Sequence, residues 1–360
     1  MQPLTLDEII KAMSGRPLGA PPTRSITSVG TDSRRVRQDE LFVALKGPRF
    51  DGHRYVPNAL AAGAAAAVVT RRSGFSQALR TSGRLIVVSN TRDALARLAA
   101  YYRGLLAASV IAVTGSNGKT TCKNMIHHVL SARRTGRAAP ASYNNDVGVP
   151  MTILSAEPTD EYLVVEIGTN APGEVSALSR IVRPDVAVVV SLGEAHLELL
   201  GDLARVAEEE TSVLEFVQTG GMAIVHSDAA YAASRYGAAG LNVIRFGPDR
   251  HADLRVNRIA MSTRGLRFRV NERFGYSLPT IGPHNAVNAL AAIAVGRRFG
   301  MDHAEIADRL RSFQPPEMRL NVSRIGAWTV IDDTYNANPA STEAAIRTLR
   351  AWPTGRRKVL

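Results

Sequence analysis

A strand–turn–helix segment near residue 115 constrains the fold of this chain more than any other feature. The apolar run 110–113 leads into a turn that carries Gly115 and Gly118, and a helical pattern follows over residues 122–130. Glycines let the backbone approach a ligand closely, and the N–H groups of such a turn and of the helix N-terminus attract anions. The segment therefore predicts a polyphosphate site in a nucleotide-binding α/β domain.

The polar residues of this turn have distinct expected roles. Lys119 can reach the terminal phosphates, and the Thr120 hydroxyl can ligate Mg²⁺. The pattern G-x-x-G-K-T is shorter than the usual G-x-x-x-x-G-K-[ST], because Val113 stands where the first glycine would be. An ordinary tight strand–helix connection is the alternative. We expect the nucleotide to contact the whole loop, namely Gly115, Ser116, Asn117, Gly118, Lys119, Thr120 and Thr121.

The alternation of strand and helix patterns divides the chain into three regions, 1–105, 106–313 and 314–360. The first is a small α/β unit, and the second has the continuous apolar strands of a parallel sheet covered on both faces, with hairpins over 243–279. The third ends as a further strand opens at 357–360, so we expect a C-terminally truncated domain. The main predicted strands are Ser25–Thr31, Leu41–Leu45, Ala66–Thr70, Arg84–Val88, Val110–Val113, Tyr162–Ile167, Asp185–Val190, Met222–Val225 and Trp328–Asp332.

Composition excludes several classes of protein. The single cysteine, Cys122, cannot form an internal disulfide and fits a reducing cytoplasm. No apolar run is long enough to cross a membrane, and the N-terminus lacks the pattern of a signal peptide. The formal net charge of +12 invites a nucleic-acid role, but the arginines are scattered and no nucleic-acid-binding motif is present. We therefore expect no nucleic-acid partner.

Besides the phosphate loop, five segments carry a resemblance to a known family, namely Tyr143–Pro150, Glu166–Asn170, Gly193–Glu198, His284–Leu290 and Asp332–Pro339. Together with the loop they resemble the Mur ligases, the ATP-dependent amide-forming enzymes of peptidoglycan precursor synthesis. The segment Asp332–Pro339 is typical of the branch that joins D-alanyl-D-alanine to UDP-MurNAc-tripeptide. The resemblance implies three domains: an N-terminal UDP-substrate domain, a central ATPase domain and an incomplete Rossmann-like C-terminal domain. It also implies a cytoplasmic enzyme, which we expect to be a monomer.

The resemblance also implies the chemistry, in which ATP phosphorylates a carboxylate and an amine then attacks the acyl phosphate. Because charge builds on the transferring phosphoryl group, cations carry most of the catalysis. The implied catalytic residues are Lys119, Glu166, His196 and Arg319, and the implied Mg²⁺ ligands include Thr120, Glu166 and His196. Further nucleotide contacts are implied for Asn285, Asn288, Arg319 and Asp333, although Asn285 could simply cap its helix.

One departure from the family concerns the second metal site. The family carries a lysine after the histidine motif, modified by CO₂ to a carbamate, whereas residues 206–214 contain no lysine. Counting from His196 places Glu210 at that position. Glu210, or a neighbour if the helix is shifted by one residue, is expected to supply a permanent carboxylate to the metal. The alternative is a solvated acidic helix face, with the second metal site weakened or lost.

The first region is expected to hold the UDP end of the substrate. The resemblance there lies in the loops 31–34 and 47–53, where Arg34 or Arg49 could pair with the diphosphate. The alternative is turn residues with solvated arginines. Expected substrate contacts are Ser33, Arg34, Asp51, Gly52, His53, Asn144 and Asn145. Two other functions stay open, namely a sister ligase that adds another amino acid and a nucleotide-binding protein without turnover.

Overall fold

The structure, a computed structural model, describes residues 1–70, 74–193, 197–229, 236–237, 240–355 and 357–360. The chain forms two compact units, and each is discontinuous in sequence. The first unit comprises Met1–Ala108, Tyr143–Asp160 and Arg180–Val182. The second comprises Ser109–Ser142, Glu161–Ser179 and Arg183–Leu360.

The first unit is built on a mostly parallel sheet, which has five strands in the described residues. The order is β2 (Arg16–Leu18), β7 (Leu85–Val88), β6 (Ala66–Thr70), β5 (Glu40–Val43) and β4 (Ser28–Gly30). Only β2 runs antiparallel to its neighbour. The carboxyl ends of β4 to β7 therefore meet at one edge of the sheet, which is where ligands bind in such folds.

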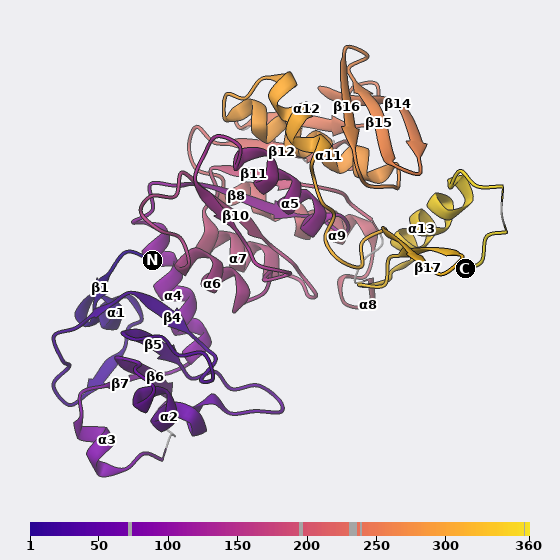
Figure 1. Ribbon diagram of the computed structural model, residues 1–360. Coiled ribbons are helices and arrows are strands. Elements are labelled where there is room, and N and C mark those ends of the chain that lie inside the picture. Colours follow the sequence, from indigo (N-terminus) through magenta and orange to yellow (C-terminus); the bar gives the residue numbers. More distant parts are fainter. Residues whose placement is uncertain (71–73, 194–196, 230–235, 238–239, 356) are drawn as a thin grey trace. The chain divides into compact units, whose positions relative to one another are not determined.

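Short helices and a small second sheet complete the first unit (Figure 1). Helix α4 (Thr91–Arg103) starts at Asn90, whose side chain accepts a hydrogen bond from the Arg92 N–H at 2.8 Å. It packs against α6 (Gly148–Leu154), which joins the first unit although it lies far along the sequence. The other elements are β1 (Leu4–Thr5), α1 (Leu6–Ala12), β3 (Ser25–Ile26), η1 (Gly52–Tyr55), α2 (Val56–Ala61) and α3 (Gln77–Thr81).

The second unit contains a larger sheet, with nine strands in the part of the chain that the structure describes. Its order is β16 (Phe274–Leu278), β15 (Gly265–Val270), β14 (Leu254–Ser262), β13 (Asn242–Gly247), β12 (Met222–His226), β11 (Val186–Val189), β8 (Ser109–Thr114), β10 (Tyr162–Glu166) and β9 (Gly136–Ala138). The strands from β14 to β9 pair in parallel, and β14, β15 and β16 form an antiparallel meander. The loop after β8 therefore opens between β10 and β11.

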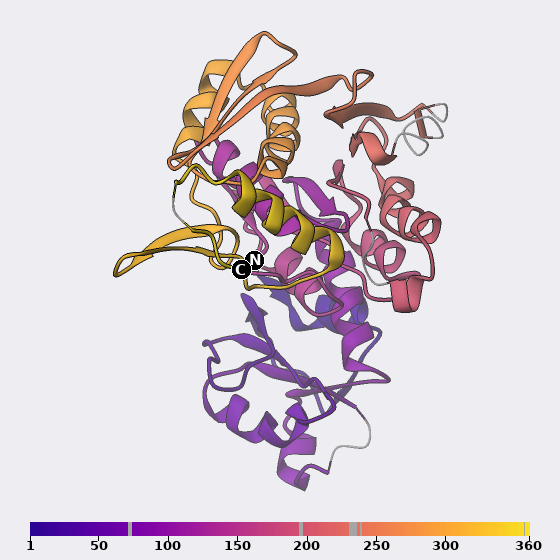
Figure 2. The same ribbon diagram turned by 90° about the vertical axis from the view of Figure 1, so that its right-hand side faces the viewer.

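Helices cover the parallel part of this sheet. Helix α5 (Lys119–Leu130) packs against α11 (His284–Arg298) on one face, and α7 (Glu174–Val182) lies on the other (Figure 1). The meander lies against α11 and α12 (His303–Arg311), as Figure 2 shows. The remaining elements are α8 (Leu197–Leu200), α9 (Leu203–Thr211), η2 (Ser212–Phe216), η3 (Ser227–Ala229), β17 (Asn321–Ile325), β18 (Trp328–Asp332) and α13 (Pro339–Ala351).

The predicted α/β class and the main strands are confirmed. The hairpins predicted over 243–279 are confirmed for β14, β15 and β16 but wrong for β13, which pairs in parallel with β12 and β14. An alternating pattern does not set the direction of the neighbouring strand. The strand expected at 357–360 is wrong, since these residues have no strand structure. A strand needs a hydrogen-bonded neighbour, and the apolar pattern of a segment does not supply one. Among the helices that are described, none has the length and apolar character needed to cross a membrane.

Candidate active site

The loop between β8 and α5 has the backbone conformation expected of a phosphate loop. Gly115 and Gly118 have φ angles of 131° and 83°, which favour glycine. A Cβ atom at Gly115 would lie 2.9 Å from the Ser191 backbone nitrogen, and one at Gly118 would lie 2.7 Å from Asn288 Oδ1. Among the described residues, no side chain caps the N-terminus of α5. The first N–H groups of this helix can therefore bind an anion.

Residues that follow β11 hold the phosphate loop from the side. The Ser191 hydroxyl accepts from the Asn117 N–H and donates to the Asn117 carbonyl, both at 3.0 Å. Ser116 makes the same reciprocal pair with Gly193, at 3.0 and 3.1 Å. Sequence reasoning missed this role of Ser191. Its position after a strand that neighbours β8 was the available signal.

The structure brings Thr120 and Glu166 together at the start of α5. The Thr120 hydroxyl donates to Glu166 Oε1 at 3.1 Å, and Glu166 is the last residue of β10. These are hard oxygen donors of the kind that Mg²⁺ prefers, so the pair fits a divalent cation. Lys119 bends back over the loop, where its ammonium group donates to the Gly115 carbonyl at 2.6 Å. Thr121 is buried behind them.

A second lysine, which sequence reasoning missed, lies beside Glu166. The Lys123 side chain is fully buried, and its Nζ lies 3.3 Å from Glu166 Oε2. Burial is the larger effect and lowers the pKa of the Lys123 ammonium group, while the Glu166 carboxylate opposes that shift. His196, the other predicted metal ligand, lies outside the described residues. Within the described residues, no group of three or more His, Cys, Asp and Glu is arranged to hold a metal.

The three consecutive glutamates of α9 have different environments. Glu208 is exposed, whereas Glu209 accepts from the N–H groups of Gly173 and Val175 at the start of α7, at 2.7 and 2.8 Å. Glu210 Oε2 accepts from the Gly115 N–H at 2.8 Å and also from the Thr114 hydroxyl. The solvated acidic face is therefore wrong for Glu209 and Glu210, which are both buried.

Glu210 is thus the glutamate that reaches the phosphate loop. Burial raises the pKa of its carboxyl group, and the nearby charge of Lys119 opposes that shift. The carboxylate is already used by two donors of the loop itself. Its role as a metal ligand stays a prediction.

Asn285 and Asn288 lie at the start of α11 beside the loop. Both are buried, and Asn288 Nδ2 donates to Asn285 Oδ1 at 3.2 Å. Asn285 Nδ2 donates to the Ile281 carbonyl at 2.7 Å. Among the residues that the structure describes, no side chain caps the start of α11, so Asn285 is not a capping residue. Asn288 forms the wall of the loop next to Gly118.

The predicted residues of the C-terminal region also make local contacts. The Arg319 guanidinium lies over the Tyr335 ring, 4.0 Å from its centroid. Asp333 Oδ1 accepts from the Leu320 N–H at 3.3 Å, and burial raises the pKa of Asp333. The side chain of Asn338, which caps α13, donates to Asn117 Oδ1 in the phosphate loop at 2.8 Å.

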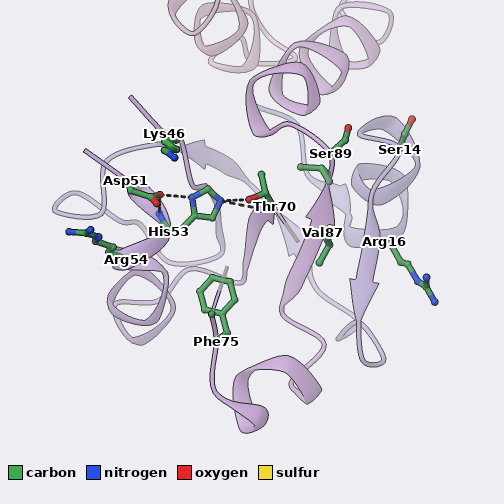
Figure 3. A pocket seen from close by; sticks show the side chains of 12 residues that line it. Ser14, Arg16, Lys46, Asp51, His53, Arg54, Thr70, Phe75, Val87 and Ser89 are labelled. Atoms are coloured by element: carbon green, nitrogen blue, oxygen red, sulfur yellow. Dashed lines mark hydrogen bonds and ion pairs between the residues drawn. The ribbon is translucent and has the colours of Figure 1, made fainter. Parts of the chain in front are cut away.

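The first unit contains a pocket of about 990 Å³ at the carboxyl edge of its sheet. Figure 3 shows Asp51, His53 and Thr70 side by side in its wall. The Thr70 N–H donates to His53 Nε2 at 3.1 Å, so His53 Nδ1 carries the proton that Asp51 Oδ1 accepts at 2.6 Å. This hydrogen bond lowers the pKa of Asp51. Sequence reasoning missed other lining residues, including Ser14, Arg16, Lys46 and Arg54.

Other predicted substrate residues lie outside the lining of this pocket. Ser33 and Arg34 follow β4, and the exposed Arg34 pairs with Asp32 at 2.8 Å. Arg49 is exposed. Position 52 requires a glycine, because a Cβ atom there would lie 2.7 Å from the Leu45 carbonyl oxygen.

The two predicted asparagines lie farther along the chain. Asn144 precedes Asn145, whose Oδ1 accepts from the N–H groups of Val147 and Gly148 at 3.2 and 2.8 Å. Asn145 therefore has a structural role at the start of α6.

Comparisons with known proteins identify relatives of this chain. Residues 113–296 match the family model of the Mur ligase middle domain, and residues 25–103 match that of the Mur ligase family, catalytic domain. The chain is 35% identical to the UDP-N-acetylmuramoyl-tripeptide–D-alanyl-D-alanine ligase of Bacillus subtilis, covering 89% of this chain and 70% of that protein. It is 34% identical to the protein of the same name from Escherichia coli, covering 97% and 77%.

Solved structures give the same picture. A crystal structure of MurF from Acinetobacter baumannii matches with a TM-score of 0.88 and 32% identity, covering 98% of this chain and 77% of that one. MurF ligase from Thermotoga maritima, crystallised in complex with ADP, matches with a TM-score of 0.79 and 29% identity, covering 93% and 76%. Both the sequence and the fold of these proteins are therefore similar to those of this chain.

Proposed function

Because this chain belongs to the Mur ligase family, we propose that it joins D-alanyl-D-alanine to UDP-N-acetylmuramoyl-tripeptide at the expense of ATP, in peptidoglycan precursor synthesis. The similarity to ligases of that name over most of the chain is the observation that carries this proposal. The γ-phosphoryl group of ATP would pass to the terminal carboxylate of the tripeptide and give an acyl phosphate and ADP. The amine of the dipeptide would then attack the acyl carbon, and inorganic phosphate would leave.

The phosphate loop would hold the triphosphate through its backbone N–H groups and the N-terminus of α5. Lys119, which donates to the Gly115 carbonyl, would exchange that acceptor for a phosphate oxygen. A fixed positive charge there stabilises the charge that builds during phosphoryl transfer. Asn285 and Asn288 would contact the adenine, and Arg319 and Asp333 would contact the γ-phosphate and the ribose.

Mg²⁺ would be held by Thr120 and Glu166, whose oxygens already lie together. When bound, the cation would neutralise negative charge on the triphosphate. We assign His196 and Glu210 to a second cation. In this chain, Glu210 would take the place of the carbamate that the family makes from lysine.

The domain roles follow the three regions of the sequence. Residues 1–105 would bind the UDP-substrate, 106–313 would bind ATP, and 314–360 would begin the C-terminal ligase domain. In the first region, Asp51 and His53 line a pocket large enough for a nucleoside diphosphate. Ser33, Arg34, Gly52, Asn144 and Asn145 are further proposed substrate contacts. We propose a cytoplasmic monomer that acts on these small-molecule substrates.

The test is phosphate release by the purified chain with ATP, Mg²⁺, the tripeptide nucleotide and D-alanyl-D-alanine. Release should require both acceptor substrates. Lys119→Ala should lower the rate by about 100-fold or more, because it removes a charge that is used in the transition state. Lys11→Ala, at an exposed lysine of α1, is the matched control and should keep the rate. ATP binding without release under any acceptor would favour a nucleotide-binding protein without turnover.

The role of Glu210 has a separate test. Since a glutamate needs no CO₂, the wild-type rate should be the same in CO₂-free buffer and with added bicarbonate. Glu210→Lys should acquire a dependence on bicarbonate. Glu208→Lys, at the exposed neighbour, should not. A marked CO₂ requirement of the wild-type chain would contradict the substitution of the carbamate by Glu210.

A further inference from the structure

Lys123 is the buried charge that the proposed reaction leaves unexplained. Its side chain has no exposed surface, although lysines are almost never fully buried unless they are paired. The ammonium group donates to the Ala139 carbonyl at 2.8 Å and to the Ala141 carbonyl, and it lies 3.3 Å from Glu166 Oε2. Two of these contacts are hydrogen bonds to backbone carbonyls, and the third is an ion pair with the carboxylate.

The ion pair with Lys123 bears on the orientation of the Glu166 carboxylate. Thr120 and Lys123 are three residues apart in α5 and therefore share one face of the helix. Thr120 meets Oε1 of Glu166, and Lys123 meets Oε2. The lysine thus directs Oε1 toward the Thr120 hydroxyl, where the two oxygens could share a cation.

The contacts with Ala139 and Ala141 reach a different part of the chain. Ala139 follows β9, and Ala141 has a φ angle of 43°, a left-handed conformation that is strained for alanine. The Lys123 ammonium group donates to the carbonyl of this residue. The chain then continues to the proposed substrate residues Asn144 and Asn145 within four residues.

We propose that Lys123 is a positioning residue that orients Glu166 for the divalent cation and fixes the backbone of residues 139–141 through the same ammonium group. This inference rests on the proposed function, because it concerns the same nucleotide site. A single buried group would then link the cation that accompanies the nucleotide to the segment that leads to the acceptor substrate.

The first test compares ADP binding in EDTA with ADP binding in Mg²⁺, by calorimetry, for the wild type and Lys123→Met. Methionine has a similar length but no charge. For Lys123→Met, the affinity for ADP in EDTA should stay close to the wild-type value. The increase in ADP affinity that Mg²⁺ produces should be about 10–100-fold smaller than in the wild type, as for other residues that orient a metal ligand. An unchanged Mg²⁺ gain would overturn the proposal. Lys119→Met is the contrasting variant and should weaken binding in both buffers.

The second test covers the case in which Lys123→Met does not fold because the buried Glu166 carboxylate loses its ion pair with Lys123. The double variant Lys123→Met/Glu166→Gln removes both charges, and Glu166→Gln alone is its matched control. Hydrogen exchange of the amides of residues 139–142 should be faster in the double variant than in the control. Equal exchange would overturn the proposal. A wild-type chain that binds no nucleotide would contradict the proposed function instead, and the exchange experiment would still decide the role of Lys123.

Discussion

Replacing Gly118 by alanine tests the proposed phosphate loop most directly. At a φ of 83° a residue with a Cβ atom is strained by about 1–2 kcal/mol. The new Cβ would also lie 2.7 Å from Asn288 Oδ1, so the Asn288 side chain must move. That movement breaks its 3.2 Å bond to Asn285, at a net cost of about 1 kcal/mol. The loop conformation is therefore destabilised by about 2–3 kcal/mol.

If the nucleotide binds only this loop conformation, that free energy appears as lost affinity. Since 1.4 kcal/mol is a factor of ten, the Kd for Mg-ADP should rise by about 30–150-fold. Gly220→Ala is the matched control, because Gly220 has a φ of 78° and no heavy atom within 4 Å of its would-be Cβ. Both variants should lose thermal stability, but only Gly118→Ala should lose affinity in a calorimetric titration. Wild-type affinity in Gly118→Ala would refute the reasoning.

Three further predictions concern other contacts. Ser191→Ala removes two hydrogen bonds to Asn117 and should weaken Mg-ADP binding by about 5–30-fold; an unchanged Kd would contradict this. Tyr102→Phe leaves the buried Ala156 carbonyl without its 2.7 Å donor, so urea denaturation should show a loss of about 1–3 kcal/mol; no loss would contradict it. Asp51→Asn should destabilise the chain by about 0.5–1 kcal/mol at pH 7. The folded state lowers the pKa of Asp51 below its ordinary value of 3.8. The difference in the free energy of unfolding between wild type and variant should therefore shrink as the pH falls below 3.8. A difference that stays constant with pH in urea denaturation would contradict the assignment.

The site residues that could be predicted from the sequence are those whose role is set by adjacent residues in the chain. Gly115, Gly118 and Lys119 belong to one short turn whose chemistry is that of its own backbone. Glu166 was also within reach, because it ends an apolar strand and parallel strands present their carboxyl ends at one edge. For these residues, the local sequence pattern was enough to predict their place in the site.

Other parts depend on contacts that no local pattern encodes. Lys123 is read from sequence as one more polar residue of a helix, and only the approach of β9 and β10 shows that it is buried. Thr70 enters the first pocket because β6 lies beside the loop that carries His53. The helix of residues 148–154 packs with elements of the first unit, although the sequence around it continues the second.

The two buried glutamates of α9 give that helix a bridging position. Consecutive side chains of a helix project about 100° apart, so Glu209 supports the first turn of α7 while Glu210 supports the turn after β8. A one-residue deletion before Glu209 would place Glu210 where Glu209 lies and Thr211 where Glu210 lies, so the turn after β8 would lose its carboxylate acceptor. A deletion in residues 203–208 should therefore be tolerated less well than a substitution at the exposed Glu208.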